Sequence, residues 1–141
     1  MTRHAESLAA LLRLRRIALD QARTALAEAL VREGQAAAAM ATLDAAMARE
    51  TEAATSLATG DYAVDAFDAW LKRTRPVRDA AEAALQSAND ATAEVRAVLA
   101  AARAGVEAAE ELLARLQAEQ AAEVERAAQH ALDDATRRRP G

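Results

Sequence analysis

The stretch TGDYAVDAFDAWLKRTRP, residues 59–76, decides the fold that this sequence predicts. It holds all three aromatic residues of the chain, Tyr62, Phe67 and Trp70, between Gly60 and Pro76. Long alanine-rich stretches with few helix breakers lie on both sides of it. Because glycine and proline interrupt regular structure, we expect the chain to reverse direction here between two long helices.

The composition supports long helices and excludes a thick globular core. Alanine fills 44 of the 141 positions and leucine 16, with only three aromatic residues and one isoleucine. Such a bias is typical of coiled coils, and alanine has the highest intrinsic helix propensity. The chain has no cysteine, which excludes disulfides, thiol catalysis and cysteine-ligated zinc.

Leucine and other apolar residues recur with a heptad spacing that predicts a coiled-coil seam along both helices. The columns 13-20-27 and 14-21-28-35 are mostly polar, as expected for the outer face of such a helix. In the first helix the seam columns are Leu12, Leu19, Leu26, Glu33, Met40, Met47, Ala54 and Leu8, Arg15, Ala22, Ala29, Ala36, Leu43, Glu50, Leu57. In the second they are Leu71, Arg78, Leu85, Thr92, Leu99, Val106, Leu113, Gln120, Ala127 and Phe67, Thr74, Ala81, Ala88, Val95, Ala102, Ala109, Leu116, Glu123.

The expected fold is all-α: an elongated antiparallel two-helix coiled-coil hairpin of one domain, residues 1–141, with a short helical segment at the turn. We expect helix A over about 5–58, the turn and short helix over 59–74, helix B over about 76–135 and a basic tail over 136–141. Gly60 suits a left-handed C-terminal cap, and Asp61 suits an N-cap. Pro76 fits the first turn of helix B, with Thr74 as its cap. One long helix paired with a second chain is the alternative.

Two other features of the helices carry expectations. Glu33, Gly34 and Gln35 interrupt the seam, which predicts a weak point or kink in helix A. After Leu116 the repeat fades, and Val124, Ala128 and Leu132 indicate a shift in its phase. A hairpin symmetric about residue 67 would bring His4 close to His130, although the sequence holds no third metal ligand at a suitable spacing.

The candidate contact residues fall into three groups. The aromatic cluster either forms a local core or presents Trp70 or Tyr62 outward as an anchor, with Phe67 inward. Arg13, Arg15 and Arg16 either pair with Glu110, Glu111, Glu119 or Glu123 across the hairpin or form a basic collar for an acidic partner. Arg137, Arg138 and Arg139 either oppose the helix dipole or bind a partner.

Several functional classes are not expected. The net charge of −4 argues against a general nucleic-acid binder. The opening residues lack a secretory signal, no stretch is apolar enough to cross a membrane, and a cytoplasmic location is expected. No motif for catalysis, metal or cofactor binding is present, so the chain is not expected to be an enzyme.

Three segments are similar to one known family. The opening helix has Leu8-x-x-Leu11-Leu12-x-Leu14-Arg15-Arg16 followed by Asp20-x-Ala22-x-x-x-Leu26. The middle has Phe67-x-x-Trp70-Leu71 after Tyr62, and the end has Leu132-Asp133-Asp134-x-x-Arg137-Arg138-Arg139. This layout resembles the FliJ/YscO-type stalk proteins of bacterial type III secretion, flagellar or injectisome.

The resemblance implies a non-enzymatic central stalk without a cofactor, cytoplasmic and peripheral to a membrane-bound secretion apparatus. Its partners would be a hexameric export ATPase, whose assembly it promotes, an export-gate membrane protein and substrate chaperones. It implies gate contact through Tyr62, Phe67, Trp70 and Leu71 at the tip. It implies ATPase contact through Arg13, Arg15, Arg16, Arg137, Arg138 and Arg139 at the terminal end. The alternative is a generic coiled-coil scaffold or chaperone-like protein with unrelated partners.

Overall fold

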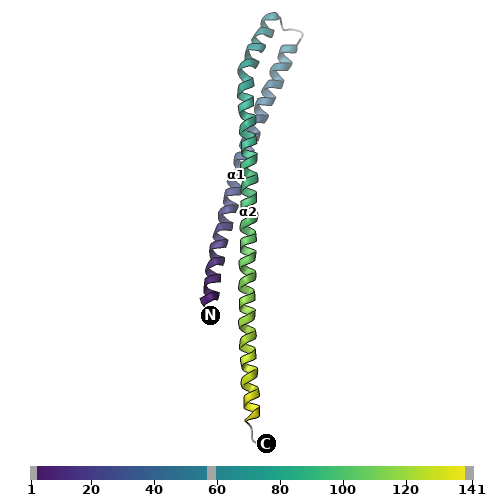
Figure 1. Cartoon of the computed structure of the whole chain (residues 1–141). Coiled ribbons are helices and arrows are strands. Elements are labelled where there is room, and N and C mark those ends of the chain that lie inside the picture. Colours follow the sequence, from purple (N-terminus) through teal and green to yellow (C-terminus); the bar gives the residue numbers. More distant parts are fainter. Residues whose placement is uncertain (1–2, 57–59, 139–141) are drawn as a thin grey trace. The chain divides into compact units, whose positions relative to one another are not determined.

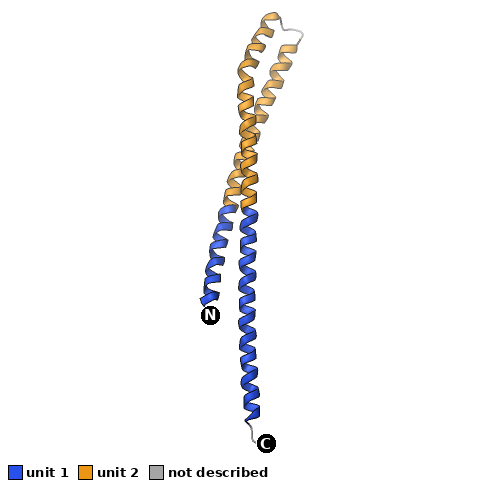
Figure 2. Cartoon of the chain, viewed as in Figure 1, with its two compact units in different colours: residues 1–22, 99–141 blue, residues 23–98 orange. Residues whose placement is uncertain are grey.

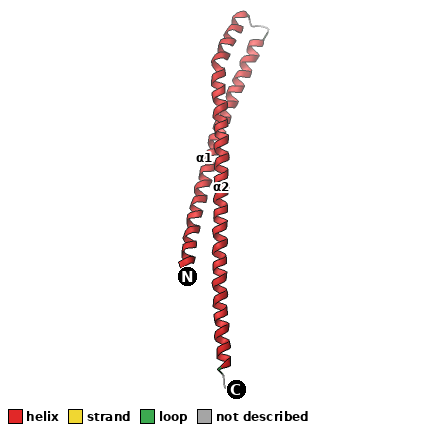
Figure 3. Ribbon diagram, viewed as in Figure 1, coloured by secondary structure: helices red, strands yellow, loops and turns green. Residues whose placement is uncertain are grey.

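Two long helices form the chain in the computed structural model, which describes residues 3–56 and 60–138. Helix α1 spans Arg3–Thr55 and helix α2 spans Asp61–Arg137 (Figure 1). They pack against each other as a hairpin, and the described residues contain no strand (Figure 3). The all-α hairpin expected from the sequence is therefore confirmed. Leu57, Ala58 and Thr59, assigned above to the end of helix A and to the turn, lie outside the described residues.

The chain divides into two compact units, each of which pairs one stretch of α1 with one stretch of α2 (Figure 2). Unit 1 comprises Met1–Ala22 and Leu99–Gly141, and unit 2 comprises Arg23–Val98. Within each unit, the two helices bury the faces that the heptad columns predict. This is the arrangement expected when an apolar stripe on one helix can be removed from water only by a second helix.

Burial follows the predicted seam closely. In α1, every described seam residue is buried or half-buried except Arg15 and Glu50. In α2, the same holds from Phe67 to Gln120, and only Glu123 and Ala127 are exposed. The most buried apolar side chains lie mainly in unit 1: Ala5, Leu12, Leu19, Ala22, Leu99, Val106 and Ala109. Unit 2 contributes only Ala29 and the polar Thr92, so unit 1 holds the better-packed part of the seam.

Arg15 occupies a seam position without being buried because the facing helix offers a glycine. A Cβ built on Gly105 would lie 3.3 Å from the Arg15 Cδ and 3.5 Å from its Nη1. The side chain therefore crosses α2 over Gly105, and its exposed position keeps the guanidinium in water. The missing side chain at position 105 thus explains how a charged residue is accommodated in an apolar column.

The break expected at Pro76 is wrong. Helix α2 continues through Pro76, so the separate short helix and the cap at Thr74 are not formed, and Thr74 is a half-buried seam residue. Proline inside a helix removes one backbone hydrogen bond and clashes with the carbonyl four residues before it. The predicted seam stays half-buried across this point, at Phe67, Leu71, Thr74, Arg78, Ala81 and Leu85. Packing along that face holds the backbone helical on both sides of the proline.

The caps at the reversal also differ from the expectation. No described glycine has a positive φ, so Gly60 is not a left-handed cap. Its carbonyl instead accepts hydrogen bonds from the N–H groups of Ala63 (3.0 Å) and Val64 (3.3 Å). Gly60 therefore precedes the first turn of α2, and Asp61 is the first helical residue rather than the cap. An acidic side chain in that first turn interacts favourably with the helix dipole.

Two ion pairs between the helices define the register. In unit 1, Arg16 Nη2 lies 3.4 Å from Glu110 Oε1, and these residues are equidistant from residue 63. In unit 2, Arg78 Nε lies 2.8 Å from Asp44 Oδ1, and these are equidistant from residue 61. The hydrogen bond to Asp44, and then the charge of that carboxylate, raise the pKa of Arg78. Because its pKa is raised, Arg78 stays protonated at every pH below the ordinary arginine pKa. Rising pH therefore does not break the Arg78–Asp44 ion pair in that range.

This register makes α2 longer than its partner helix. Symmetry about residue 67 is wrong, because the ion pairs place the centre several residues earlier. Residues 121–138 of α2 are all exposed, and from about Glu123 onward they lie beyond the described start of α1. The predicted phase shift through Val124, Ala128 and Leu132 is therefore not a continued seam. His130 lies in this segment, whereas His4 lies beside Glu119, so the two histidines do not meet.

Glu33 is the least favourable residue of the seam. Helix α1 runs unbroken through Glu33 and Gly34, but the Glu33 Oε2 is buried without a hydrogen-bond partner. A buried acceptor without a partner costs about 1–3 kcal/mol. We therefore expect Glu33→Leu to raise the free energy of unfolding by about 1–2 kcal/mol, measured by urea denaturation followed by circular dichroism.

Glu50→Leu is the matched control for Glu33→Leu. Glu50 also falls on a seam column but is exposed, so its replacement should change the free energy of unfolding by less than about 0.5 kcal/mol. Destabilisation by Glu33→Leu would contradict the unpaired buried oxygen and would indicate that the carboxylate has a stabilising partner.

Candidate functional site

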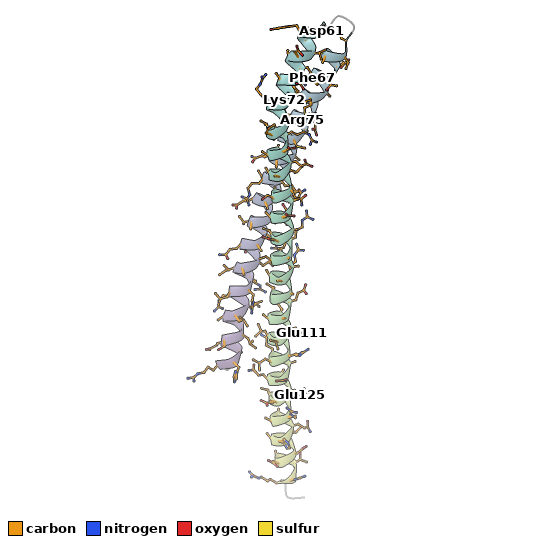
Figure 4. All side chains as sticks on the ribbon, turned by 45° about the horizontal axis from the view of Figure 1, so that its top comes forward. Asp61, Phe67, Lys72, Arg75, Glu111 and Glu125 are labelled. Atoms are coloured by element: carbon orange, nitrogen blue, oxygen red, sulfur yellow. The ribbon has the colours of Figure 1, made fainter. Side chains whose placement is uncertain are left out.

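The aromatic residues of unit 2 lie on the first turns of α2, near Asp61 (Figure 4). Phe67 and Trp70 are half-buried, with ring centroids 6.2 Å apart and planes at 21°, so the two rings are stacked. Leu71 is half-buried as well, whereas Tyr62 is 89% exposed. Phe67 thus serves the local core, and Tyr62 projects outward. We call Tyr62, Phe67, Trp70 and Leu71 the aromatic surface.

An open cleft of about 480 Å³ adjoins the aromatic surface. Alanines from both helices and the three aromatic side chains line it. Glu50 of α1 and Arg73 of α2 supply its charged groups. Such a combination of small apolar residues, rings and a few polar groups can accept an apolar side chain of a protein partner. The full lining is Glu50, Ala53, Ala54, Tyr62, Ala63, Ala66, Phe67, Trp70 and Arg73.

The arginines near the start of α1 are exposed side chains of unit 1. Only Arg16 pairs across the hairpin, with Glu110, and both of these side chains are about half exposed. Of the other acids expected to pair with this group, Glu111 instead binds Arg115 of its own helix at 2.6 Å. Among the described residues, Arg13 and Arg15 form no ion pair and carry charges that a partner could use.

The arginines at the end of the chain do not adjoin those of α1. Arg137 closes α2, and the Arg138 N–H donates to the Asp134 carbonyl at 3.1 Å. Arg139 lies outside the described residues. Arg137 follows Glu110, the partner of Arg16, by roughly 40 Å along the helix. The five described arginines of the predicted contact region therefore form two separate groups, of which the second lies at the far end of the exposed part of α2.

The sequence analysis missed two exposed apolar faces of unit 1. The first is the overhang, defined as residues 121–137 of α2, where Val124 is 71% and Leu132 61% exposed. The second is the outer face of α1, defined as Leu14 and Ile17, which are 64% and 54% exposed. The signal was available for the second face, because Leu14 and Ile17 are large apolar residues off the seam columns. The overhang could be recognised only after the register of the two helices was known.

The described residues contain no group of three or more histidine or acidic side chains that could hold a metal ion. Within the same residues, neither helix has a segment apolar enough to span a bilayer. The chemistry that these surfaces offer is that of association: exposed rings, exposed aliphatic side chains and unpaired arginines.

Comparison with known proteins returns no match to a family model, to a curated protein or to a solved structure. The function is therefore inferred from the surfaces described above and from the sequence resemblance.

Proposed function

We propose that this chain is the central stalk of a type III secretion export apparatus, which binds the hexameric export ATPase and promotes its assembly. The observation that carries this proposal is the pair of exposed arginines, Arg13 and Arg15, which form no ion pair among the described residues of helix α1. Unpaired cations on a rigid helix can dock on an acidic protein surface, and their charge accelerates encounter with it. The resemblance to the FliJ/YscO-type family supplies the identity of that partner.

The aromatic surface belongs to the same proposal as the contact for the export gate. Tyr62 exposes nearly its whole side chain, and tyrosine is among the residue types enriched in the energetic centres of interfaces. The adjoining cleft gives a partner side chain a place to insert. Because this surface lies in unit 2 and the arginines lie in unit 1, the two contacts use different residues and can be tested separately.

The test is the ATP hydrolysis rate and the hexamer content of the type III export ATPase from the same organism, with and without the purified chain. The proposal predicts that both rise. The triple variant Arg13→Glu, Arg15→Glu, Arg16→Glu should raise the concentration needed for half-maximal stimulation by about tenfold or more at low salt. The difference should shrink as salt screens the exposed charges.

Tyr62→Ala is the control for the arginine variant, because it alters the other surface and should leave ATPase stimulation unchanged. Circular dichroism should be the same for all three proteins. If the helical wild-type chain changes neither the rate nor the hexamer content, the stalk proposal fails and a scaffold with unrelated partners takes its place.

A further inference from the structure

Helix α2 carries a third apolar column beside its two seam columns in unit 2. The residues of this column recur every seven positions and are Trp70, Val77, Ala84, Ala91 and Val98. Val77 is 53% exposed and Val98 is 59% exposed. A two-helix coiled coil needs only two apolar columns per helix, whereas a helix of a larger bundle carries a third. The apolar face of α2 is therefore wider than packing on α1 alone requires.

Helix α1 has a matching column on the same side of the hairpin. Its residues, apolar except for one arginine, are Ala25, Arg32, Ala39, Ala46 and Ala53. Ala53 and Trp70 line the cleft beside the aromatic surface. Arg32 lines a second open cleft, of about 550 Å³, together with Ala84 and Ala91. Both clefts join the two columns into one surface of unit 2, which we call the second seam.

Four charged side chains border the second seam, two toward each end of unit 2. Glu28 and Glu94 lie toward one end, and Arg49 and Arg73 lie toward the other. All four are exposed, and none forms an ion pair with another described residue. The ion pair between the helices of unit 2 sets Glu28 level with Glu94, because both are equidistant from residue 61. Arg49 and Arg73 are level with each other for the same reason. Each acid lies about 32 Å along its helix from the arginine.

Two more charges face the same side, and they cancel each other. Arg32 belongs to the second seam, and Glu50 lies on the adjoining seam column of α1. Glu52 and Asp90 directly precede residues of the second seam and therefore point about 100° away from this side. Together with the four bordering charges, the side holds three acids and three arginines, so it has no net charge. Its occupant should be apolar, with arginines opposite the acids and acids opposite the arginines.

We propose that the chain forms a symmetric dimer through the second seam, with the two copies turned end for end. A second copy meets the requirement above, because the reversal sets its arginines at the level of the first copy's acids. The two-fold axis crosses α1 between Ala38 and Ala39 and α2 between Ala83 and Ala84, where small side chains let the helices approach closely. Each helix lies antiparallel to its counterpart in the second copy. This inference does not depend on the proposed function.

All four bordering charges gain an opposite charge in this dimer. Glu28 faces Arg49 of the second copy, and Glu94 faces Arg73 of the second copy. The two-fold axis repeats both pairs, so four pairs form along the edges of the contact. One axis satisfies both helices, because the midpoints between acid and arginine on α1 and on α2 are equidistant from residue 61. Such charge pairs fix the register and the direction of a contact.

A parallel dimer through the same surface is the less favourable arrangement. With both hairpins pointing the same way, α1 would pack on α2 of the second copy at equal levels. Glu28 would then face Glu94 of the second copy, and Arg49 would face Arg73. Like charges at close range are repulsive, so the charge pattern selects the antiparallel dimer.

The second seam is large enough for a stable contact. The α1 stretch of unit 2 is about 50 Å long and two adjacent helices are about 20 Å wide, so the surface covers on the order of 1,000 Å². Stable interfaces bury about 800 Å² per partner. The antiparallel dimer also brings Trp70 against Val98 of the second copy. Tyr62 stays exposed, because it lies on an outward column of α2.

Analytical ultracentrifugation of the full chain over a range of concentrations tests the dimer. Interfaces of this size have Kd values of about micromolar or below, so the wild type should be dimeric at about 100 μM. Added salt should weaken the wild-type dimer, because its edge pairs are attractive. The double variants Glu28→Arg, Glu94→Arg and Arg49→Glu, Arg73→Glu set like charges against each other. Each should raise the dimer Kd by at least about tenfold at low salt.

Arg75→Glu, Arg96→Glu is the matched control for the arginine variant. Both residues are exposed in unit 2, and they lie on the other side of the seam from the second seam. The net charge of the chain changes by the same amount in the control as in the arginine variant. The control should therefore change the dimer Kd by less than about twofold at moderate salt.

An equimolar mixture of the two double variants tests the pairing of charges. One variant carries only arginines at the four bordering positions, and the other carries only glutamates. Every edge pair of a mixed dimer is therefore attractive, whereas each variant alone is repelled. The mixture should associate at least about tenfold more tightly than either variant by itself. A mixture that stays as weak as its components would overturn the proposed pairing.

The charge exchange Arg73→Glu, Glu94→Arg distinguishes the antiparallel from the parallel dimer. It keeps an acid opposite an arginine in the antiparallel dimer, so the Kd should stay within about twofold of the wild-type value. In a parallel dimer it would turn repulsion into attraction, and a lower Kd would contradict the proposal. A wild type that is monomeric at about 100 μM overturns it, as does either double variant that dimerises like the wild type. Circular dichroism verifies that each variant is helical.

Discussion

Pro76→Ala is expected to raise the free energy of unfolding by about 2–3 kcal/mol. Proline in a helix interior is roughly 3 kcal/mol less favourable than alanine, because it removes a backbone donor and clashes with the preceding turn. The greater freedom of alanine in the unfolded chain reduces that gain by up to about 1 kcal/mol. Urea denaturation followed by circular dichroism at 222 nm measures the difference.

The same variant separates the two interpretations of this region. If Pro76 opened a new helix, as the sequence predicts, its substitution would be neutral or destabilising, because proline is well suited to a first helical position. Asp79→Ala, an exposed change in the next turn, is the control and should stay within about 0.5 kcal/mol of the wild type. A loss of stability in Pro76→Ala would contradict a continuous α2.

Leu12→Ala is expected to lower the free energy of unfolding by about 2–3 kcal/mol. Leu12 is 7% exposed and belongs to the best-packed part of the seam, with Leu19, Leu99 and Val106 among the buried residues of its unit. Removal of a buried leucine side chain costs its transfer free energy and leaves a cavity. We expect a loss in the lower part of the usual range for truncation of a buried leucine, because a two-helix seam can partly collapse around the cavity.

Leu14→Ala is the matched control, with the same substitution two residues further along α1. Leu14 is 64% exposed, so its truncation should change stability by less than about 0.5 kcal/mol at a concentration where the chain is monomeric. Equal losses in both variants would mean that the heptad columns do not identify the buried face of α1.

The seam could be predicted from the sequence because it depends on local spacing alone. Leu12, Leu19 and Leu26 recur every seven residues, and a helix turns that spacing into one face whatever its partner. The inward Phe67 and outward Tyr62 were also within reach, since a two-helix tip cannot bury three rings. Burial bears out both expectations.

Pro76 was misinterpreted because its local preference is opposed by packing on both sides. A proline signal reports the cost of continuing a helix, but it does not report the free energy of the contacts that continuation preserves. The flanking seam residues Leu71 and Leu85 are half-buried, and their contacts oppose the cost of the proline. Gly60 shows the same limitation. The sequence predicts a left-handed cap at this glycine, but its carbonyl instead accepts hydrogen bonds from the first turn of α2.

The register could not be predicted from the sequence, because the alanine and leucine columns of the two helices can pair at many offsets. Shifting one helix by a heptad keeps most apolar contacts and changes only a few charge pairs. The pairs Arg16–Glu110 and Arg78–Asp44, together with Gly105 facing Arg15, select the observed offset. The overhang and the separation of the two arginine groups follow from that selection, which is why neither was foreseen.

The register is the claim on which both the overhang and the separation of the arginine groups depend. Its most direct test is the distance between spin labels attached to cysteines introduced into this cysteine-free chain. The structure predicts a short distance for the pair Arg16→Cys, Glu110→Cys. For Arg16→Cys, Ala118→Cys it predicts a separation displaced by roughly 12 Å along the helix. A shorter distance for the second pair would centre the hairpin on residue 67 and contradict the account.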